Sequence, residues 1–167
     1  MEEIVNRVAK SGLVNFNLED YYTQGKRRVF DLAPLLWNGL VLKEKDFRKA
    51  LQEMDWSSYK DTCVAVNCSA DAVIPVWAYM LVATYLTPIA KKVVKGTLND
   101  LERELFIEQL ATTNFSEYKD KRVIIRGCSQ YPAPEEAYVY VVQKLQPIAK
   151  SIMYGEACST VPLFKKK

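Results

Sequence analysis

Asp55-Trp56-Ser57-Ser58-Tyr59-Lys60-Asp61 recurs later in the chain as Asn114-Phe115-Ser116-Glu117-Tyr118-Lys119-Asp120, at an offset of 59 residues. The same offset relates a second block, in which Pro75, Ala78, Tyr79, Leu86, Pro88, Ile89, Ala90, Lys91 and Gly96 recur as Pro134, Ala137, Tyr138, Leu145, Pro147, Ile148, Ala149, Lys150 and Gly155. Between the two blocks the offset is 60, so Cys68-Ser69 matches Cys128-Ser129. Self-similarity of this extent predicts an internal duplication, which determines the architecture.

The duplication divides the chain into segments. The two copies extend over residues 42–96 and 101–155. Residues 1–41 precede them as an N-terminal covering segment, and residues 156–167 follow them as a C-terminal tail. A chain of 167 residues with 49% apolar and 26% charged residues is large enough to bury a core, so we expect a single domain.

Each copy carries the signals of a helix, a strand, a second helix and a second strand. In the first copy the strands are predicted at 62–67 and 91–95, and the second helix runs from near Pro75 to near Pro88. The same signals in the second copy predict strands at 122–127 and 151–154 and a helix from near Pro134 to near Pro147. We therefore expect an α/β fold, in which duplicated helix-β-α-β units form a largely parallel sheet with helices packed on it.

The flanking segments contain further predicted elements. The first forty residues predict a helix at 4–10 and a strand at 27–32, and the tail predicts a strand at 161–164.

The stretch 72–90 carries no charge, and its length approaches that of a membrane span. Its counterpart in the second copy carries Glu135, Glu136 and Lys144, so both copies predict a helix outside the membrane. Something must cover the apolar face of the first copy. We expect the N-terminal segment to cover it, and a homodimer interface built on Trp77 and Tyr85 is the alternative.

Composition excludes several classes of function. The chain has no histidine, which rules out Ser-His-Asp triads, Cys-His dyads and imidazole-ligated metals. The net charge of +3 comes from basic residues that mostly alternate with acids, although Lys26-Arg27-Arg28 and Lys165-Lys166-Lys167 are same-sign runs. We expect no nucleic-acid partner. The opening Met1-Glu2-Glu3 has no signal-peptide pattern, so we expect a cytoplasmic protein.

Three of the four cysteines precede a serine: Cys68, Cys128 and Cys158. Cys68 and Cys128 each follow a predicted strand and precede a helix, and Cys158 follows the strand that ends near Gly155. Parallel strands would bring all three thiols to one edge of the sheet, where ligands of open α/β sheets bind. Cys63 lies inside a strand, and we interpret it as a small buried hydrophobic residue.

Three converging thiolates suit zinc or an iron–sulfur centre. Asp71 and Glu156 are the nearest candidates for a fourth ligand. The spacing matches no zinc or ferredoxin motif, so two other classes remain open. One is a sulfur-transfer or redox enzyme, in which one thiolate is the nucleophile and another resolves the intermediate. The other is a structural or interaction protein with inert buried thiols.

Three segments resemble an uncharacterised bacterial family, the domain-of-unknown-function family 2480: Leu18–Tyr22, Cys68–Leu81 and Ser151–Leu163. The resemblance extends over essentially the whole chain. It assigns no reaction and no catalytic residue. The resemblance implies a gene that, as is often the case in this family, lies near the iron–sulfur assembly genes of the sulfur-mobilisation system. The resemblance therefore implies an accessory of cluster assembly or sulfur handling, with iron–sulfur assembly proteins as partners.

Overall fold

A computed structural model of the chain describes residues 12–127, 130–156 and 159–167. It forms two compact units, and we describe each by itself. Unit 1 comprises residues 1–23 and 105–167, and unit 2 comprises residues 24–104. We expected a single domain with residues 1–41 as one covering segment. Instead, this segment is divided between the units: it supplies β1 to unit 1 and β2 to unit 2.

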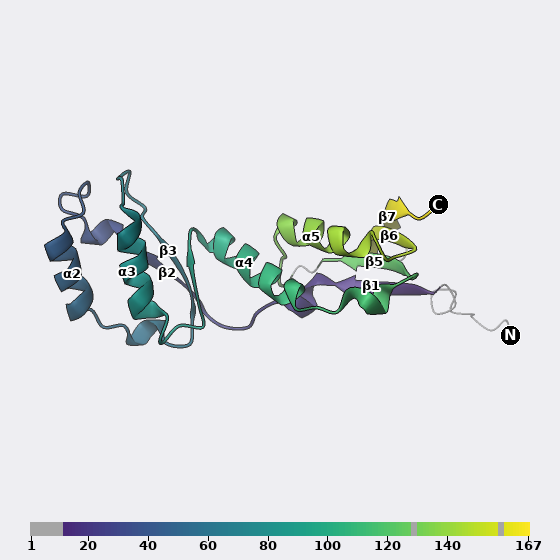
Figure 1. Ribbon diagram of the computed structural model, residues 1–167, viewed down its shortest axis with the longest axis horizontal. Coiled ribbons are helices and arrows are strands. Elements are labelled where there is room, and N and C mark those ends of the chain that lie inside the picture. Colours follow the sequence, from purple (N-terminus) through teal and green to yellow (C-terminus); the bar gives the residue numbers. More distant parts are fainter. Residues whose placement is uncertain (1–11, 128–129, 157–158) are drawn as a thin grey trace. The chain divides into compact units, whose positions relative to one another are not determined.

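Unit 2 contains a parallel sheet of three strands in the order β2-β3-β4. Its elements in chain order are β2 (Arg27–Asp31), α2 (Glu44–Glu53), β3 (Cys63–Asn67), α3 (Val76–Leu86), β4 (Lys92–Lys95) and the start of α4 (Leu98–Ala111). Helices α2 and α3 lie on the same side of β2 and β3 (Figure 1). Short 3-10 turns precede and follow α2, at Ala33–Leu35 and Ser57–Tyr59.

The core of unit 2 follows from the alternation of side chains along the strands. Val64 and Val66 of β3 point to the helices and contact Phe47 of α2 and Val82 of α3. All four side chains are almost completely buried. Burial of each such side chain stabilises the fold by roughly 1.5–3 kcal/mol.

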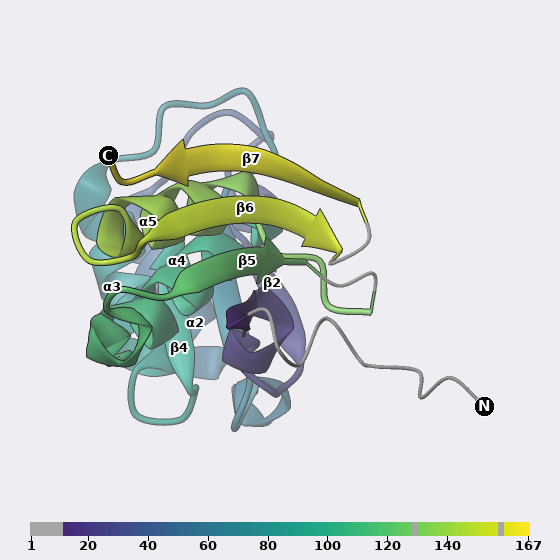
Figure 2. The ribbon, with the colours of Figure 1, turned by 90° about the vertical axis from the view of Figure 1, so that its right-hand side faces the viewer.

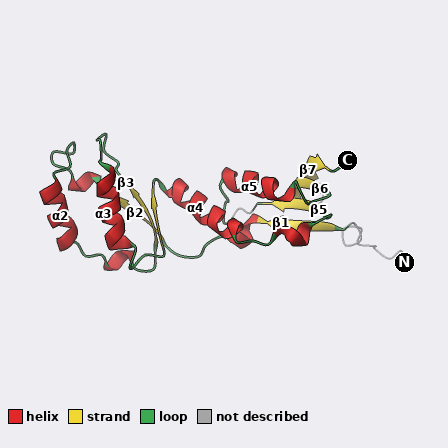
Figure 3. Ribbon diagram, viewed as in Figure 1, coloured by secondary structure: helices red, strands yellow, loops and turns green. Residues whose placement is uncertain are grey.

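Unit 1 contains a sheet of four strands in the order β1-β5-β6-β7. Its elements are β1 (Leu13–Asn17), the second part of α4, β5 (Arg122–Arg126), α5 (Glu135–Leu145), β6 (Ser151–Glu156) and β7 (Ser159–Lys165), with 3-10 turns at Leu18–Tyr21 and Phe115–Tyr118. Strands β1, β5 and β6 are parallel, and β7 runs back beside β6 (Figure 2). Colouring by secondary structure separates these strands from the helices (Figure 3).

The core of unit 1 repeats the arrangement of the core of unit 2. Val123 and Ile125 of β5 contact Phe106 of α4 and Val141 of α5, and Phe16 of β1 completes the cluster. In both units the chain thus forms a strand, a helix, a second strand, a second helix and a third strand. The three strands are neighbours in the sheet in that same order, and the helices pack on one face.

Most local expectations agree with the structure. Helices α3 and α5 begin directly after Pro75 and Pro134, and the strands predicted at 27–32 and 161–164 are β2 and β7. The helix predicted at 4–10 lies outside the described residues.

The prediction of one largely parallel sheet needs correction. The strands fall into two sheets, each mainly or wholly parallel. Strand β1, which pairs with β5 along its full length, was also not predicted from the sequence. Both errors concern strand pairing, which depends on residues far apart in the chain.

The expected cover of the uncharged helix also needs correction. Trp77 of α3 packs edge-on against Phe47 of α2 with ring centroids 6.0 Å apart, and Tyr85 stacks on Trp56 at 5.0 Å. Helix α2 and Trp56 after it therefore cover Trp77 and Tyr85, whereas residues 1–41 contribute Leu32 and Leu35 to the same core. Val76 and Met80 of the uncharged helix stay exposed. Trp77 and Tyr85 are half-buried within unit 2, and the homodimer interface built on them stays a prediction.

Candidate thiol sites at the carboxyl edges of the sheets

Cys68 follows directly after β3, at the carboxyl edge of the sheet in unit 2. Its side chain is half-buried, and its thiol lies 3.7 Å from the carbonyl oxygen of Ala70, to which it donates a weak hydrogen bond. The place of Cys68, just past the end of a strand and before a helix, is the one that the sequence predicts. The backbone turns away from the strand at Cys68, so the thiol lies where the loop to α3 begins.

Asp31 fixes the loop that follows Cys68. It ends β2, the neighbouring strand, and it lies opposite Asn67 in the ladder. Its carboxylate accepts hydrogen bonds from the Ser69 hydroxyl at 2.5 Å, the Ser69 N–H at 2.9 Å and the Ala33 N–H at 3.0 Å. Partial burial raises the pKa of Asp31, but these three donors outweigh burial and lower the pKa overall.

Tyr79 lies beside Cys68 on the helix side of the edge. Burial raises the pKa of the Tyr79 phenol, and a thiolate at Cys68 would raise it further. The Lys95 ammonium, at the end of β4, lies 5.5 Å from the centre of the Tyr79 ring. The edge thus combines a thiol, a phenol and a cation within one sheet edge.

Two other polar groups occupy this edge. Asp71, predicted as a metal ligand, is exposed in the loop between β3 and α3. The Oδ1 atom of Asn67 is buried and has no hydrogen-bond partner within the part of the chain that the structure describes.

Cys128 and Cys158, the other two predicted thiol ligands, lie outside the described residues. The strands that precede them are described. Strands β5 and β6 are neighbours in one sheet, with Ile125 opposite Tyr154. Cys68 follows β3, which belongs to the other sheet. The strand before Cys68 therefore belongs to a different sheet from the strands before Cys128 and Cys158, and the three-thiol site stays a prediction.

An ion pair joins the carboxyl ends of β5 and β6. Arg126 donates to both carboxylate oxygens of Glu156, from Nε at 3.2 Å and from a terminal nitrogen at a shorter distance. Glu156, predicted as a metal ligand, is therefore held by Arg126 in this structure. The pair holds the two strand ends together and keeps a guanidinium group at this edge.

Aromatic side chains surround the same edge. Tyr138 of α5 reaches Gly127, where an added Cβ atom would collide with the Tyr138 hydroxyl, and its ring packs edge-on against Tyr154 at 5.8 Å. Tyr22 stacks on Tyr131 at 4.3 Å. A pocket of about 510 Å³ opens beside them, lined by Ile125, Glu135, Tyr138, Val139, Val142, Tyr154 and Leu163. It is of the size that small ligands occupy, and its lining is mostly apolar.

Cys63 is completely buried within β3, as predicted for a structural thiol. Burial raises the pKa of its thiol, and the charges of Arg27 and Lys91 only partly oppose this shift. A buried, protonated thiol reacts slowly, so Cys63 serves as an internal control for the other cysteines.

The described residues contain no group of three or more Cys, Asp or Glu side chains placed to hold a metal ion. Within the same ranges, every helix is too short or too polar to cross a bilayer.

Sequence reasoning missed the bonds that organise both edges. The Asp31–Ser69 and Arg126–Glu156 interactions each join neighbouring strands whose residues are far apart in the chain. A polar residue at the end of a predicted strand is the signal that could have indicated them.

Comparison with known proteins gives one match. No curated protein and no solved structure matches the chain. A family model described as "Protein of unknown function (DUF2480)" matches residues 2–166, so the chain belongs to this family.

Proposed function

We propose that this protein binds a soft metal ion or an iron–sulfur cluster through cysteine thiolates, as an accessory of cluster assembly or sulfur handling. The observation that carries the proposal is the junction of β5 and β6. Cys128 and Cys158 each follow, two residues later, a residue of the Arg126–Glu156 ion pair. Loops that leave adjacent strand ends start close together, so this sequence position favours a pair of neighbouring thiols.

Charge at this edge supports thiolate chemistry. The Arg126 guanidinium favours thiolates over thiols, and only thiolates bind soft metals strongly. Glu156 partly neutralises that charge in the metal-free chain. In this proposal Glu156 would serve as an oxygen ligand of a bound metal, and Arg126 would balance the charge of the thiolates.

Cys68 and Asp71 have a separate place in the proposal. Because β3 belongs to the sheet of unit 2, Cys68 would provide a second, separate thiolate ligand for a metal ion. Tyr79 and Lys95 lie at the same sheet edge. Asp71 is exposed in the same loop and takes no part in the Asp31–Ser69 hydrogen bonds. We therefore assign Asp71 as the oxygen ligand of the metal ion that Cys68 would bind.

We further infer that the two thiol edges are copies of one ancestral edge. The turns before β3 and β5 support this inference. Asp61 and Asp120 both have positive φ, 56° and 58°, and their N–H groups donate to the carbonyls of Ile89 and Ile148 at 2.9 and 2.8 Å. Equivalent residues at an offset of 59 thus adopt the same unusual conformation and make the same bond.

Metal analysis of anaerobically purified protein tests the proposal. We expect about one zinc ion or one iron–sulfur centre per chain in the wild type, and loss of the metal in Cys128→Ser and Cys158→Ser. Cys63→Ala, which changes the buried thiol, is the matched control and retains the metal. Cys68→Ser retains it if the pair alone forms the site, and loses it if all three thiols share one centre.

Two other outcomes identify the remaining classes. Sub-stoichiometric metal in the wild type contradicts metal binding. If a trivalent arsenical that needs two thiols then labels the wild type but neither Cys128→Ser nor Cys158→Ser, the pair is a dithiol of a redox or sulfur-transfer enzyme. If neither metal nor arsenical binds and no cysteine alkylates quickly at neutral pH, the protein is a structural or interaction protein.

A further inference from the structure

Basic residues from three separate segments meet at the opposite edge of the sheet in unit 1. Arg122 begins β5, Ser151 begins β6 and Lys165 ends β7. The ladder places Arg122 opposite Ser151 and Ser151 opposite Lys165, so the three residues form one row across three strands. In the sequence the two cations of this row, Arg122 and Lys165, are far apart.

Residues that flank this row add further positive charge. The Lys150 N–H donates to the carbonyl of Lys121 at 2.8 Å, and the Lys166 N–H donates to the carbonyl of Lys150 at 2.9 Å. These backbone bonds hold the three lysines at the same edge. The Lys166 ammonium lies 3.9 Å from Asp120, an exposed ion pair that screening by salt weakens.

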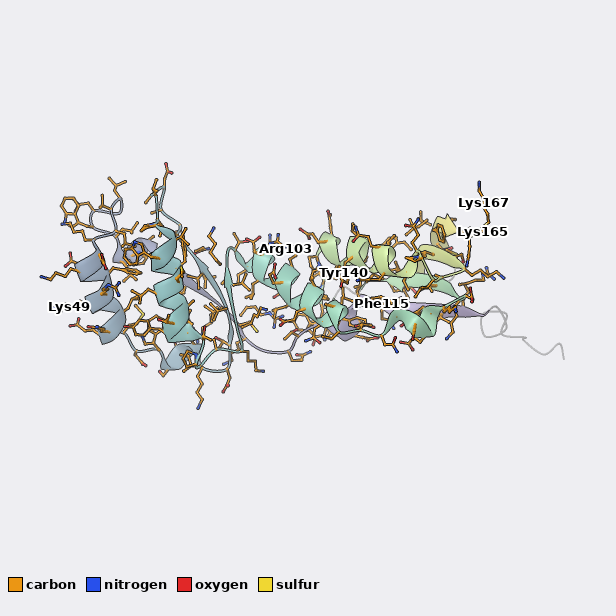
Figure 4. The ribbon with its side chains drawn as sticks, in the orientation of Figure 1. Lys49, Arg103, Phe115, Tyr140, Lys165 and Lys167 are labelled. Atoms are coloured by element: carbon orange, nitrogen blue, oxygen red, sulfur yellow. The ribbon has the colours of Figure 1, made fainter. Side chains whose placement is uncertain are left out.

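A pocket of about 450 Å³ lies at this edge, lined by Arg122, Lys150, Ser151, Met153, Pro162, Phe164 and Lys165. Three of these seven residues are cations, and Ser151 adds a hydroxyl. Met153, Pro162 and Phe164 give the pocket an apolar floor. Figure 4 labels Lys165, at the end of β7, and Lys167, two residues beyond it.

We propose that this pocket binds a small organic anion with an apolar body. Arg122, Lys150 and Lys165 hold its phosphate or carboxylate group, and the Ser151 hydroxyl donates to the same group. The apolar body rests on Met153, Pro162 and Phe164. Inorganic phosphate would use only half of this surface, and an apolar cation of the same shape would be repelled. The site is independent of the thiol edges, because it lies at the other ends of β5 and β6.

Titration of the full chain with phenyl phosphate, followed by amide NMR, tests the proposal. We expect saturable shifts at Ser151, Met153 and Phe164, and affinity roughly tenfold higher than for inorganic phosphate, because the phenyl ring buries apolar surface. Benzoate distinguishes carboxylate from phosphate as the preferred group. The double substitution Lys150→Gln and Lys165→Gln should weaken phenyl phosphate binding by about tenfold.

Two further variants separate the charged and apolar halves of the pocket. Met153→Thr suits a strand and should reduce the preference for phenyl phosphate over inorganic phosphate, while inorganic phosphate binds as before. The matched control replaces Lys45 and Lys49 with glutamine. Both lysines are exposed on α2 in unit 2, and Figure 4 labels Lys49 there, so this control removes the same charge without touching the pocket.

Three results would overturn the proposal. The first is unchanged binding of phenyl phosphate by the Lys150→Gln and Lys165→Gln double variant. The second is equal binding of phenyltrimethylammonium, which would show that shape alone selects the ligand. The third is binding of a single-stranded oligonucleotide without binding of phenyl phosphate, which would make this edge a surface for polyanions.

Discussion

Tyr118 shows how one buried side chain makes the fold sensitive to pH. Its ring packs against Phe16 at 5.4 Å and Phe115 at 6.5 Å, and only 8% of the residue is exposed. Burial, followed by the effects of Tyr21 and Glu117, raises the pKa of Tyr118 to about 12. The phenol therefore stays protonated in the folded chain at pH values where an unfolded chain, with a tyrosine pKa of about 10, loses the proton.

This shift predicts a loss of stability in alkali. The stabilising contribution of Tyr118 is fully present below about pH 10 and is lost as pH rises to about 12, because only the unfolded state releases the proton in that window. Tyr118→Phe removes this dependence. Urea unfolding at several pH values between 8 and about 11 should show a smaller fall in the free energy of unfolding for the variant than for the wild type.

Tyr59, the counterpart of Tyr118 in unit 2, is the matched control. Burial raises its pKa too, but the charge of Arg28 opposes that shift. Tyr59→Phe should therefore change the alkaline slope less than Tyr118→Phe does. Equal slopes for both variants would show that burial of the phenol does not control the alkaline transition.

At the scale of single elements, the start of α4 depends on a reciprocal cap. The Thr97 hydroxyl and N–H both donate to Asp100, at 2.8 and 2.7 Å, and the Asp100 N–H donates weakly to the Thr97 hydroxyl at 3.3 Å. This is a capping box, with aspartate in the position that glutamate usually takes. Gly96 precedes it with φ of 148°, and an added Cβ atom would lie 2.6 Å from the Asp100 carboxylate.

The crowding at Gly96 predicts a coupled effect of two substitutions. Gly96→Ala should destabilise unit 2 by about 2 kcal/mol, because alanine disfavours this φ and its methyl group displaces the capping carboxylate. Asp100→Ala alone should cost about 1 kcal/mol. The double variant should lose less stability than the sum of the two, and urea unfolding of all four proteins measures that difference. Strict additivity would show that the alanine methyl does not act through the cap.

The elements themselves were largely predictable because their signals are local. Proline before α3 and α5 and β-branched runs in β3 and β5 act within a few residues, and the structure has these elements where expected. Strand β1 was missed because its sequence, LVNFN, is short and polar at two of five positions. Its pairing with β5 stabilises it as a strand, and that pairing leaves no trace in the local sequence.

At the scale of the whole molecule, the sequence predicted the α/β class but not the division into two sheets. Any parallel strand can in principle extend either sheet, and only contacts between distant residues decide which one it joins. Phe16 joins the core of unit 1, whereas Phe30, fourteen residues later, joins the core of unit 2. For the same reason the sequence could not show that the strand before Cys68 and the strand before Cys128 belong to different sheets.

This arrangement makes unit 1 discontinuous in sequence and unit 2 continuous. Unit 2 has its own core, so a fragment of residues 24–104 should fold alone. A fragment of residues 97–167 keeps the cap of α4 but lacks β1. It loses Phe16 and Leu18, which are 1% and 0% exposed in the core, and it leaves one side of β5 without a partner strand.

The second fragment should therefore fold only when β1 is supplied in trans. Loss of two fully buried large side chains costs roughly 2–5 kcal/mol for each, and the sum is comparable to the total stability of a small domain. We expect the 97–167 fragment to give a poorly dispersed amide NMR spectrum, and a synthetic peptide of residues 12–23 to restore dispersion. A peptide carrying Phe16→Ala and Leu18→Ala keeps the backbone donors and acceptors of β1 and should not restore it. If the 97–167 fragment folds without any peptide, or if the substituted peptide works equally well, the core contribution of β1 is not what holds unit 1 together.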